Sequence, residues 1–178
     1  MGGNLEGSRY ALISAVAALA EVGEAGTASS LYRSAPRERT DQPDFLNAAL
    51  ALETDLAPRP LLAELKAIER RLGRDPFGER YGPRLIDLDL LAIDDLCVED
   101  VPDLVVPHPR LAERRFALEP LAELDPDLRP WAACPGERRE LTVAQALAAV
   151  MDQDVEVVEG PAWAGDIGQS RIPGTVEP

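Results

Sequence analysis

Two long segments of the chain carry apolar residues at helical spacing. The first predicted helix begins at a Ser8 cap and ends near Gly23. The second follows Pro58 and Pro60 and is closed by Gly73. The apolar stripes are Leu12, Ile13, Val16, Leu19 and Ala20 in the first helix, and Leu61, Leu65, Ile68 and Leu72 in the second.

Two further helices are predicted in the second half of the chain. One runs from about Arg110 to Leu124. Thr142 and Gln145 have the spacing of a capping box, which predicts another helix over residues 143–151.

The segments between the first two helices favour strands. Ala28–Ser34 predicts a short strand, and Phe45–Glu53 predicts a longer one. In the longer strand Leu46, Ala48, Leu50 and Leu52 share an apolar face, which leaves Phe45 and Asn47 on the other. The polar connection 35–44 is longer than a tight hairpin needs, and loops of this kind often carry function.

Pro83–Asp95 predicts a third strand with two aspartates in its middle. Because side chains alternate along a strand, Ile86, Leu88, Leu90 and Ala92 share one apolar face, and Asp87 and Asp89 are neighbours on the other. Two carboxylates on a half-buried face repel each other and lose hydration unless a cation compensates. The alternative is a solvent-exposed face that the aspartates merely hydrate.

The order of these elements is that of an α+β protein with a split βαβ sheet from which the first strand is missing. Met1 falls where that strand should finish, so we expect the chain to lack it, unless residues 155–158 replace it. We expect one domain over residues 1–159 and a loosely held tail over residues 160–178, which is rich in Gly and Pro.

Composition excludes several classes of function. A net charge of −14 and an aromatic content of 4% argue against nucleic acid as a partner. No apolar run reaches the length of about 20 residues that a membrane span needs, and no secretory signal follows Met1, so we expect a cytoplasmic protein. Cys97 and Cys134 could pair, but with one histidine in the chain they cannot form a usual zinc site. The GxxxxGK[ST] phosphate loop is absent.

A cluster of arginines interrupts this acidic background. Five lie between residues 70 and 84, against two acids, Asp75 and Glu79. Arg70 and Arg71 fit the last turn of a helix, where the helix dipole favours cations. The other three, Arg74, Arg80 and Arg84, lie in the loop GRDPFGERYGPR that leads into the aspartates.

Two interpretations of these charges remain open at this point. The arginines and aspartates could form internal salt bridges. They could also hold a polyphosphate together, with the carboxylates binding Mg²⁺ and the guanidinium groups binding phosphate oxygens. The segment VPHPRLAERRF favours phosphate, since it sets the only histidine, His108, beside Arg110, Arg114 and Arg115 at the start of a helix.

Three segments resemble the 6-hydroxymethyl-7,8-dihydropterin pyrophosphokinase family of folate biosynthesis. They are SAPRERTDQPDFLNAAL, RLGRDPFGERYGPRLIDLDLL and VPHPRLAERRF, and the similarity covers roughly residues 2–150. GPRxxDLDLL followed by VPHPR is specific, whereas a DxD alone would be weak. The resemblance implies a ferredoxin-like α+β fold and transfer of pyrophosphate from ATP, the co-substrate, to the pterin hydroxymethyl group, with release of AMP. It also implies two Mg²⁺ ions, and we expect the enzyme to act as a monomer.

The resemblance also implies roles for individual residues. Asp87 and Asp89 would bind the metal ions. The pterin would lie between the rings of Phe45 and Phe116 and pair with Asn47. The nucleotide would be bound by Glu69, Arg74, Arg80, Arg84, His108 and Arg114, of which Arg74 and Arg84 are expected to be catalytic with the aspartates. Ser34 and Ala35 would add contacts to the pterin.

The match departs from the family pattern at three positions. Tyr81 stands where tryptophan is common, Pro76 where a second loop arginine is common, and Gly3 where serine is usual. Phe45, Phe116 and His108 could instead be ordinary packed residues. The alternative function is a non-catalytic ferredoxin-like module that binds a nucleotide or metal, or a paralogue that has lost activity.

Overall fold

The computed structural model describes residues 1–100 and 104–165 of the 178-residue chain. Its strands are β1 (Gly2–Gly3), β2 (Glu24–Ala28), β3 (Leu31–Ser34), β4 (Phe45–Asn47), β5 (Leu50–Glu53), β6 (Val98–Asp100), β7 (Leu104–Val106) and β8 (Val155–Glu159). Its α-helices are α1 (Ser8–Leu19), α2 (Pro58–Arg71), α3 (Arg115–Leu124) and α4 (Val143–Ala148), and its short 3₁₀ helices are η1 (Leu111–Glu113), η2 (Glu137–Glu140) and η3 (Pro161–Ala164). The protein is mixed α and β with antiparallel sheets, as expected for the α+β class.

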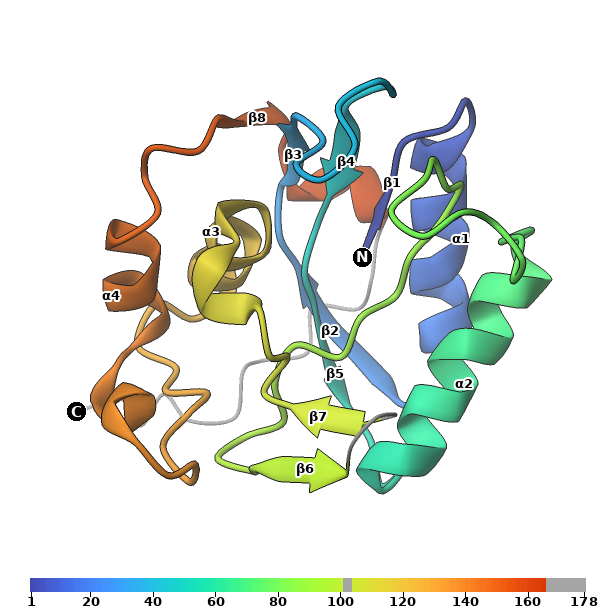
Figure 1. Ribbon diagram of the computed structural model, residues 1–178. Helices are drawn as coiled ribbons and strands as arrows, with labels where there is room; N and C mark the ends of the chain where they lie inside the picture. Colours follow the sequence, from blue (N-terminus) through green and yellow to red (C-terminus); the bar gives the residue numbers. More distant parts are fainter. Residues whose placement is uncertain (101–103, 166–178) are drawn as a thin grey trace.

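The central sheet has the strand order β1-β4-β3-β8, and every pairing in it is antiparallel. Below it β2 pairs with β5, so that the β2–β3 and β4–β5 segments form two long ribbons side by side (Figure 1). In Figure 1, α1 and α2 lie on one side of these ribbons, and α3 and α4 lie on the other. A separate hairpin is formed by β6 and β7.

A truncated first strand, as expected, is what the described residues show, since only residues 2–3 form β1. Its backbone is paired on both sides, with β4 and, through an isolated bridge between Gly2 and Asp87, with the aspartate segment. The approach to that segment is close, because a Cβ atom on Gly3 would lie 2.3 Å from the carbonyl oxygen of Leu85. A serine at this position would therefore force the two segments apart. The segment 155–158 does not replace β1, since β8 pairs with β3 at the opposite edge.

The predicted strand Phe45–Glu53 is divided into β4 and β5. The predicted strand Ala28–Ser34 forms over β3, whereas β2, which ends at Ala28, lies almost wholly outside the prediction. In the gap between β4 and β5, the Ala49 N–H donates to the Ser29 hydroxyl at 2.9 Å, while the Ser29 N–H donates to the Ala49 carbonyl at 3.0 Å. A side chain thus replaces a backbone acceptor, and the ladder is interrupted there. Residues 83–95 do not form a regular strand either, although Ile86 and Leu88 are buried as the alternation predicted.

The helix predictions are confirmed for α2 with its closing Gly73, and for the capping box of Thr142 and Gln145. The prediction of a single helix from residue 110 to 124 is wrong, because Arg114 has an extended backbone between η1 and α3. Helix α4 ends at Ala148, before the predicted residue 151. Ser8 is not the cap of α1. Its hydroxyl accepts the Leu5 N–H, and the residue before the helix is Gly7 in a left-handed conformation.

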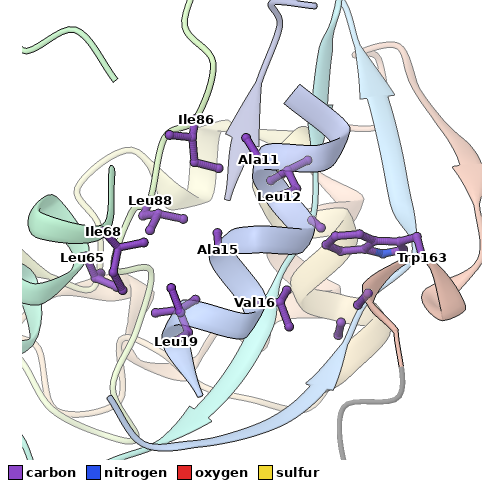
Figure 2. Packing of buried hydrophobic residues seen from close by; sticks show 14 of the residues in the cluster. Ala11, Leu12, Ala15, Val16, Leu19, Leu65, Ile68, Ile86, Leu88 and Trp163 are labelled. Carbon is purple, nitrogen blue, oxygen red and sulfur yellow. The ribbon is translucent and has the colours of Figure 1, made fainter. Parts of the chain in front are cut away.

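The main core lies between α1, α2 and the sheet (Figure 2). Leu12, Val16 and Leu19 of α1 meet Leu65 and Ile68 of α2 there. Ile86 and Leu88 of the aspartate segment are buried in the same cluster. Their burial holds the neighbouring Asp87 and Asp89 at the edge of the core. A second apolar cluster joins η1, α3 and α4 around Trp131.

The tail predicted from residue 160 is packed in its described part. Trp163 of η3 lies in the main core, 3% exposed, and its indole N–H donates to the Ser29 carbonyl at 2.8 Å. The rest of the predicted tail, residues 166–178, lies outside the described residues. Cys97 and Cys134, whose pairing the sequence left open, form a disulfide. Among the described helices, none is both long and apolar enough to cross a membrane.

Candidate active site

A cavity of about 290 Å³ opens beside β1, β3 and β4, between the loop 35–44 and the arginine loop 74–84. Its lining contains residues from five separate segments of the chain. The residues predicted for the site that the structure brings to this lining are Ser34, Ala35, Phe45, Asn47, Arg74, Arg84, Asp87, Asp89, His108, Arg114 and Phe116.

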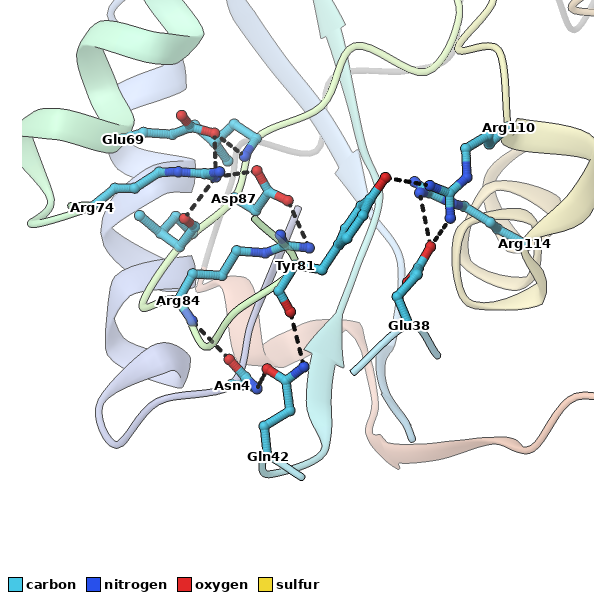
Figure 3. A network of polar contacts seen from close by, with 12 residues as sticks. Asn4, Glu38, Gln42, Glu69, Arg74, Tyr81, Arg84, Asp87, Arg110 and Arg114 are labelled. Carbon is cyan, nitrogen blue, oxygen red and sulfur yellow. Dashed lines mark hydrogen bonds and ion pairs between the residues drawn. The ribbon is translucent and has the colours of Figure 1, made fainter. Parts of the chain in front are cut away.

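Asp87 lies between two arginines. Arg74 donates a hydrogen bond to one of its carboxylate oxygens, and Arg84 Nη2 lies 3.0 Å from the other (Figure 3). Burial alone would raise the pKa of Asp87, but the charges of Arg84 and Arg74 outweigh it and hold the pKa below its ordinary value. Asp87 therefore stays ionised in the folded protein, while Asp89, two residues on, is exposed at the cavity.

Glu69 does not line the cavity. It is 2% exposed and lies behind the aspartates, where its carboxylate accepts the Leu88 N–H at 2.6 Å, Lys66 Nζ at 2.8 Å and Arg74 Nη1 at 3.2 Å. Burial raises the pKa of Glu69, and the Leu88 N–H and the two cations oppose that rise. The observed contacts tie α2 to the aspartate segment and to the arginine loop.

Arg80 is the other predicted residue outside the cavity lining. Its guanidinium lies 4.9 Å from the centre of the Tyr81 ring and donates to the Tyr81 hydroxyl at 3.0 Å. Tyr81 itself lines the cavity and has a positive φ of 61°. At the position where the family often has tryptophan, an aromatic ring thus still faces the site.

Two aromatic rings lie beneath arginines at the cavity. The guanidinium of Arg84 lies 5.2 Å from the Phe45 ring centre, and that of Arg114 lies 5.5 Å from the Phe116 ring centre. Both rings are half-buried rather than part of a closed core. Arg84 and Arg114 each have a buried Nε atom without a hydrogen-bond partner among the described residues, so each retains a donor for a bound acceptor.

The polar end of the cavity next to Phe45 is preorganised. Asn47 is 6% exposed, and its side-chain N–H donates to the Ser34 hydroxyl at 3.0 Å. The register of the sheet sets these residues close together, since Ser34 is opposite Phe45 and Asn47 is opposite Gly2. Asn47 is thus held between β1 and β3 at the cavity wall.

His108 follows the cis peptide bond between Val106 and Pro107. Its Nδ1 accepts the Arg110 N–H at 3.2 Å. Burial lowers the pKa of His108, with Arg114 acting in the same direction and Asp89 against it. The imidazole is therefore neutral at pH 7, and its Nε2 carries the proton.

Sequence reasoning missed several residues of this site. Lys66 lines the cavity and donates to the Leu88 carbonyl at 2.9 Å as well as to Glu69. Its spacing of three residues from Glu69 on a helix could have indicated that ion pair. Glu38 and Arg37 also line the cavity, and no pattern in the sequence distinguishes them from other loop charges. Arg115, grouped with Arg114 in sequence, pairs with Glu119 instead.

The loops around the cavity are linked through Asn4, which is buried at the turn after β1. Its side-chain amide donates to Gln42 at 3.0 Å and to the Pro43 carbonyl at 2.9 Å, and its oxygen accepts the Arg84 N–H at 2.8 Å (Figure 3). Gln42 in turn donates to the Tyr81 carbonyl at 3.0 Å. Asn4 thereby holds the loop 35–44 and the arginine loop in one arrangement.

Known proteins share these features of sequence. A protein of Methylorubrum extorquens named 2-amino-4-hydroxy-6-hydroxymethyldihydropteridine pyrophosphokinase is 45% identical over 131 residues, 74% of this chain and 77% of that protein. A protein of Pseudomonas aeruginosa with the same name is 41% identical over 148 residues, 77% of this chain and 90% of that protein. The mitochondrial folate synthesis bifunctional protein of Arabidopsis thaliana is 50% identical over 96 residues, which are 54% of this chain and 17% of that protein.

A family model agrees with these relatives. The model described as 7,8-dihydro-6-hydroxymethylpterin-pyrophosphokinase (HPPK) matches residues 1–126. The match contains both aspartates, the arginine loop and His108. The chain therefore belongs to the 7,8-dihydro-6-hydroxymethylpterin-pyrophosphokinase family.

Proposed function

We propose that this cavity carries out the reaction of the family, the transfer of pyrophosphate from ATP to 6-hydroxymethyl-7,8-dihydropterin in folate biosynthesis. The observation that carries the proposal is the meeting, in one cavity, of two carboxylates, several guanidinium groups and two aromatic rings. A non-catalytic nucleotide-binding module is not favoured, because named pyrophosphokinases match this chain at 41–45% identity.

The pterin is proposed to bind at the end of the cavity formed by β3 and β4. The flat ring would lie between Phe45 and Phe116, whose half-buried faces suit stacking. The amide of Asn47 would pair with the polar edge of the pterin, and Ser34 and Ala35 would add contacts beside it. Burial of Asn47 favours this role, because its side chain is fixed before the ligand arrives.

The triphosphate is proposed to bind at the cationic end. Arg74, Arg84 and Arg114 line the cavity there, and guanidinium groups match phosphate oxygens in geometry and charge. The Nε2–H of His108 would donate a further hydrogen bond to phosphate. Arg80 would reach the nucleotide only after leaving Tyr81, its present partner.

The donor set fits magnesium. Asp87 and Asp89 both line the cavity, and Mg²⁺ usually takes one or two carboxylates together with substrate phosphates. Among the described residues no cluster of three or more acidic, histidine or cysteine side chains could form a complete protein site, which agrees with a metal bound jointly with ATP. When bound, two Mg²⁺ ions would neutralise charge on the phosphates. Arg74 and Arg84 would then have to release part of their hold on Asp87.

The chemistry asks little of the protein beyond position and charge. The pterin hydroxymethyl oxygen attacks the β-phosphorus of ATP and loses its proton to water, the bond from that phosphorus to the α-phosphate oxygen breaks, and AMP leaves. Arg74, Arg84 and Arg114 would stabilise the charge that develops on the phosphate oxygens. Asp87 is a poor base, because its arginine partners hold its pKa below the ordinary value. Glu69 is proposed to act through Arg74 and Leu88 as a positioning residue.

The finer fold assignment, a ferredoxin-like split βαβ sheet, is also a proposal. It is supported by the position of β1 between β4 and the Asp87 segment, and by the order β1-α1-β3-β4-α2 along the chain. We further propose that the protein acts as a monomer.

The test is the release of AMP by purified protein with ATP, Mg²⁺ and the hydroxymethylpterin. AMP should appear in proportion to pterin diphosphate, and neither should form without the pterin. The variant Asp89→Asn should bind the pterin and form no product. Binding of ATP with no AMP from the wild-type protein would show that the chain is a binding module instead.

A further inference from the structure

Glu38 is an acidic residue at the cationic end of the proposed active site. It lies in the loop 35–44 and lines the cavity. Its carboxylate forms an ion pair with Arg110, and the same oxygen lies 4.0 Å from Arg114 Nη2 (Figure 3). A single carboxylate oxygen thus faces two guanidinium groups, one of which lines the proposed phosphate site.

The two arginines form a site that attracts an anion. Arg114 is 15% exposed in its side chain, and its Nε is buried without a hydrogen-bond partner among the described residues. Burial and the like charge of Arg110 both lower the pKa of Arg114. Two cations in this arrangement repel each other, and a shared anion relieves the repulsion. In the structure that anion is the side chain of Glu38.

A phosphate group would compete for the same place. Carboxylates and phosphates both accept paired hydrogen bonds from guanidinium groups, and the geometry of the donors is the same for both. Glu38 is 35% exposed in its side chain and lies on a connecting loop, so its carboxylate can leave without disturbing the core. Arg110 keeps a second partner, since its Nη1 also lies 3.3 Å from the Tyr81 hydroxyl.

We propose that Glu38 sets the affinity of the site for polyphosphate: its carboxylate occupies the anion position of Arg110 and Arg114 in the ligand-free protein, and a nucleotide phosphate displaces it. This inference rests on the proposed function, because it takes the triphosphate of ATP as the incoming anion. A polyphosphate ligand must break the ion pairs of Glu38 before it binds. The affinity of the site for that ligand is therefore lower than it would be without Glu38. The opposite role, a clamp that holds the loop 35–44 in a binding-competent position, would make Glu38 favourable for binding.

The experiment measures the binding of inorganic tripolyphosphate by calorimetry, with EDTA present and without pterin. Glu38→Gln should bind it about 1.5- to fivefold more tightly than the wild type, the range for losing one partly exposed ion pair. Glu38→Asp keeps the charge and should remain nearer to the wild-type value. Equal or weaker binding by Glu38→Gln would overturn the proposal and favour the clamp.

The matched control is Glu156→Gln, which changes the net charge of the chain by the same amount. Glu156 pairs with Arg33 at 3.0 Å on the surface of β3 and β8, outside the cavity lining. The affinity of the Glu156→Gln variant for tripolyphosphate should equal that of the wild type. If Glu156→Gln gained affinity as much as Glu38→Gln, the effect would be one of overall charge, and the specific role of Glu38 would be refuted.

Failure of this inference can be told apart from failure of the proposed function. Tripolyphosphate binding needs no turnover, so tighter binding by Glu38→Gln would support the inference even in a chain that releases no AMP. In the reverse case, AMP would be released normally while Glu38→Gln bound tripolyphosphate no better than the wild type. The KM for ATP gives a second readout, and it should fall in Glu38→Gln by a similar factor.

Discussion

The carboxylate of Glu69 accepts the backbone N–H of Leu88 at 2.6 Å, at the residue that separates the two aspartates. Because Leu88 is itself buried in the main core, this hydrogen bond fixes the backbone between a packed side chain and a buried acid. Glu69 also holds Lys66 and Arg74, one on its own helix and one on the arginine loop. The orientation of the aspartates thus depends on a residue outside the cavity lining.

Glu69→Gln should therefore weaken both stability and turnover. Glutamine keeps an oxygen for the Leu88 N–H but removes the charge that Lys66 and Arg74 share, so we expect a loss of about 1–3 kcal/mol in the free energy of unfolding. Urea denaturation and steady-state kinetics measure the two effects. Glu64→Gln, an exposed position on the same helix, should change neither. Wild-type stability and activity in Glu69→Gln would refute its positioning role.

The two aspartates should differ in their effect on stability. Both Asp87→Asn and Asp89→Asn should abolish turnover, because each removes a carboxylate proposed to bind metal. Only Asp87 pairs with Arg74 and Arg84 in the structure, so only its variant should destabilise the metal-free protein, by about 1–3 kcal/mol. Removing one of two repelling carboxylates would otherwise be neutral or stabilising. Thermal unfolding in EDTA decides between these outcomes, and an equal loss in both variants would contradict the difference.

The ion pairs of Asp87 also predict a pH dependence. The folded protein holds the pKa of Asp87 below its ordinary value of 3.8, so ionised Asp87 contributes stability above that pH. The contribution is lost as the pH falls through the folded-state pKa. The difference in unfolding free energy between wild type and Asp87→Asn, measured without metal, should therefore be largest at neutral pH and shrink below 3.8. A difference that stayed constant down to low pH would show that Asp87 titrates normally.

The sequence predicted the parts of this protein that depend on local patterns. Leu61, Leu65 and Ile68 recur at helical spacing, and they form the buried face of α2. The motif that joins Arg84 to Asp87 predicts their proximity, because the two residues are three positions apart. The two interpretations of the arginines and aspartates, internal salt bridges and a phosphate site, are compatible, since Asp87 forms a salt bridge with Arg74 and also lines the cavity.

The missed features depend on contacts between distant segments. β1 has only two residues, too few for any periodicity, and it is identified by its pairing with Asn47 and Asp87. The partner of Glu38 is 72 positions away, and the sequence shows only an acid between two arginines. The burial of Trp163 likewise follows from the position of Ser29, to which no sequence pattern relates it.

Arg84 should not tolerate lysine. Its guanidinium forms an ion pair with the Asp87 carboxylate and lies over the Phe45 ring. Its buried Nε has no hydrogen-bond partner among the described residues. Lysine keeps the charge but cannot make these contacts together, so Arg84→Lys should lower kcat/KM at least about tenfold, equivalent to roughly 1.4 kcal/mol. Arg71→Lys is the control, because Arg71 pairs with Glu21 on the exposed surface. Similar losses in both variants would mean that the arginine fork has no special role at Arg84.

Trp163 should contribute to stability without contributing to the reaction. It lies beyond the residues that match the family model, yet its ring is buried against α1 and its indole N–H donates to the Ser29 carbonyl. Trp163→Ala should cost about 3–5 kcal/mol, since a large buried side chain is lost. Trp163→Phe keeps most of the ring but leaves the Ser29 carbonyl without that donor, so its cost should be nearer 1–3 kcal/mol. Tyr10→Ala removes an aromatic side chain that is 74% exposed on α1, and its effect on stability should be nearly neutral.

Because Trp163 does not line the cavity, KM values should stay at wild-type levels in whichever Trp163 variant remains folded. Stability equal to wild type in Trp163→Ala would mean that η3 is dispensable, and altered KM values would mean that this segment acts on the site as well as on the core.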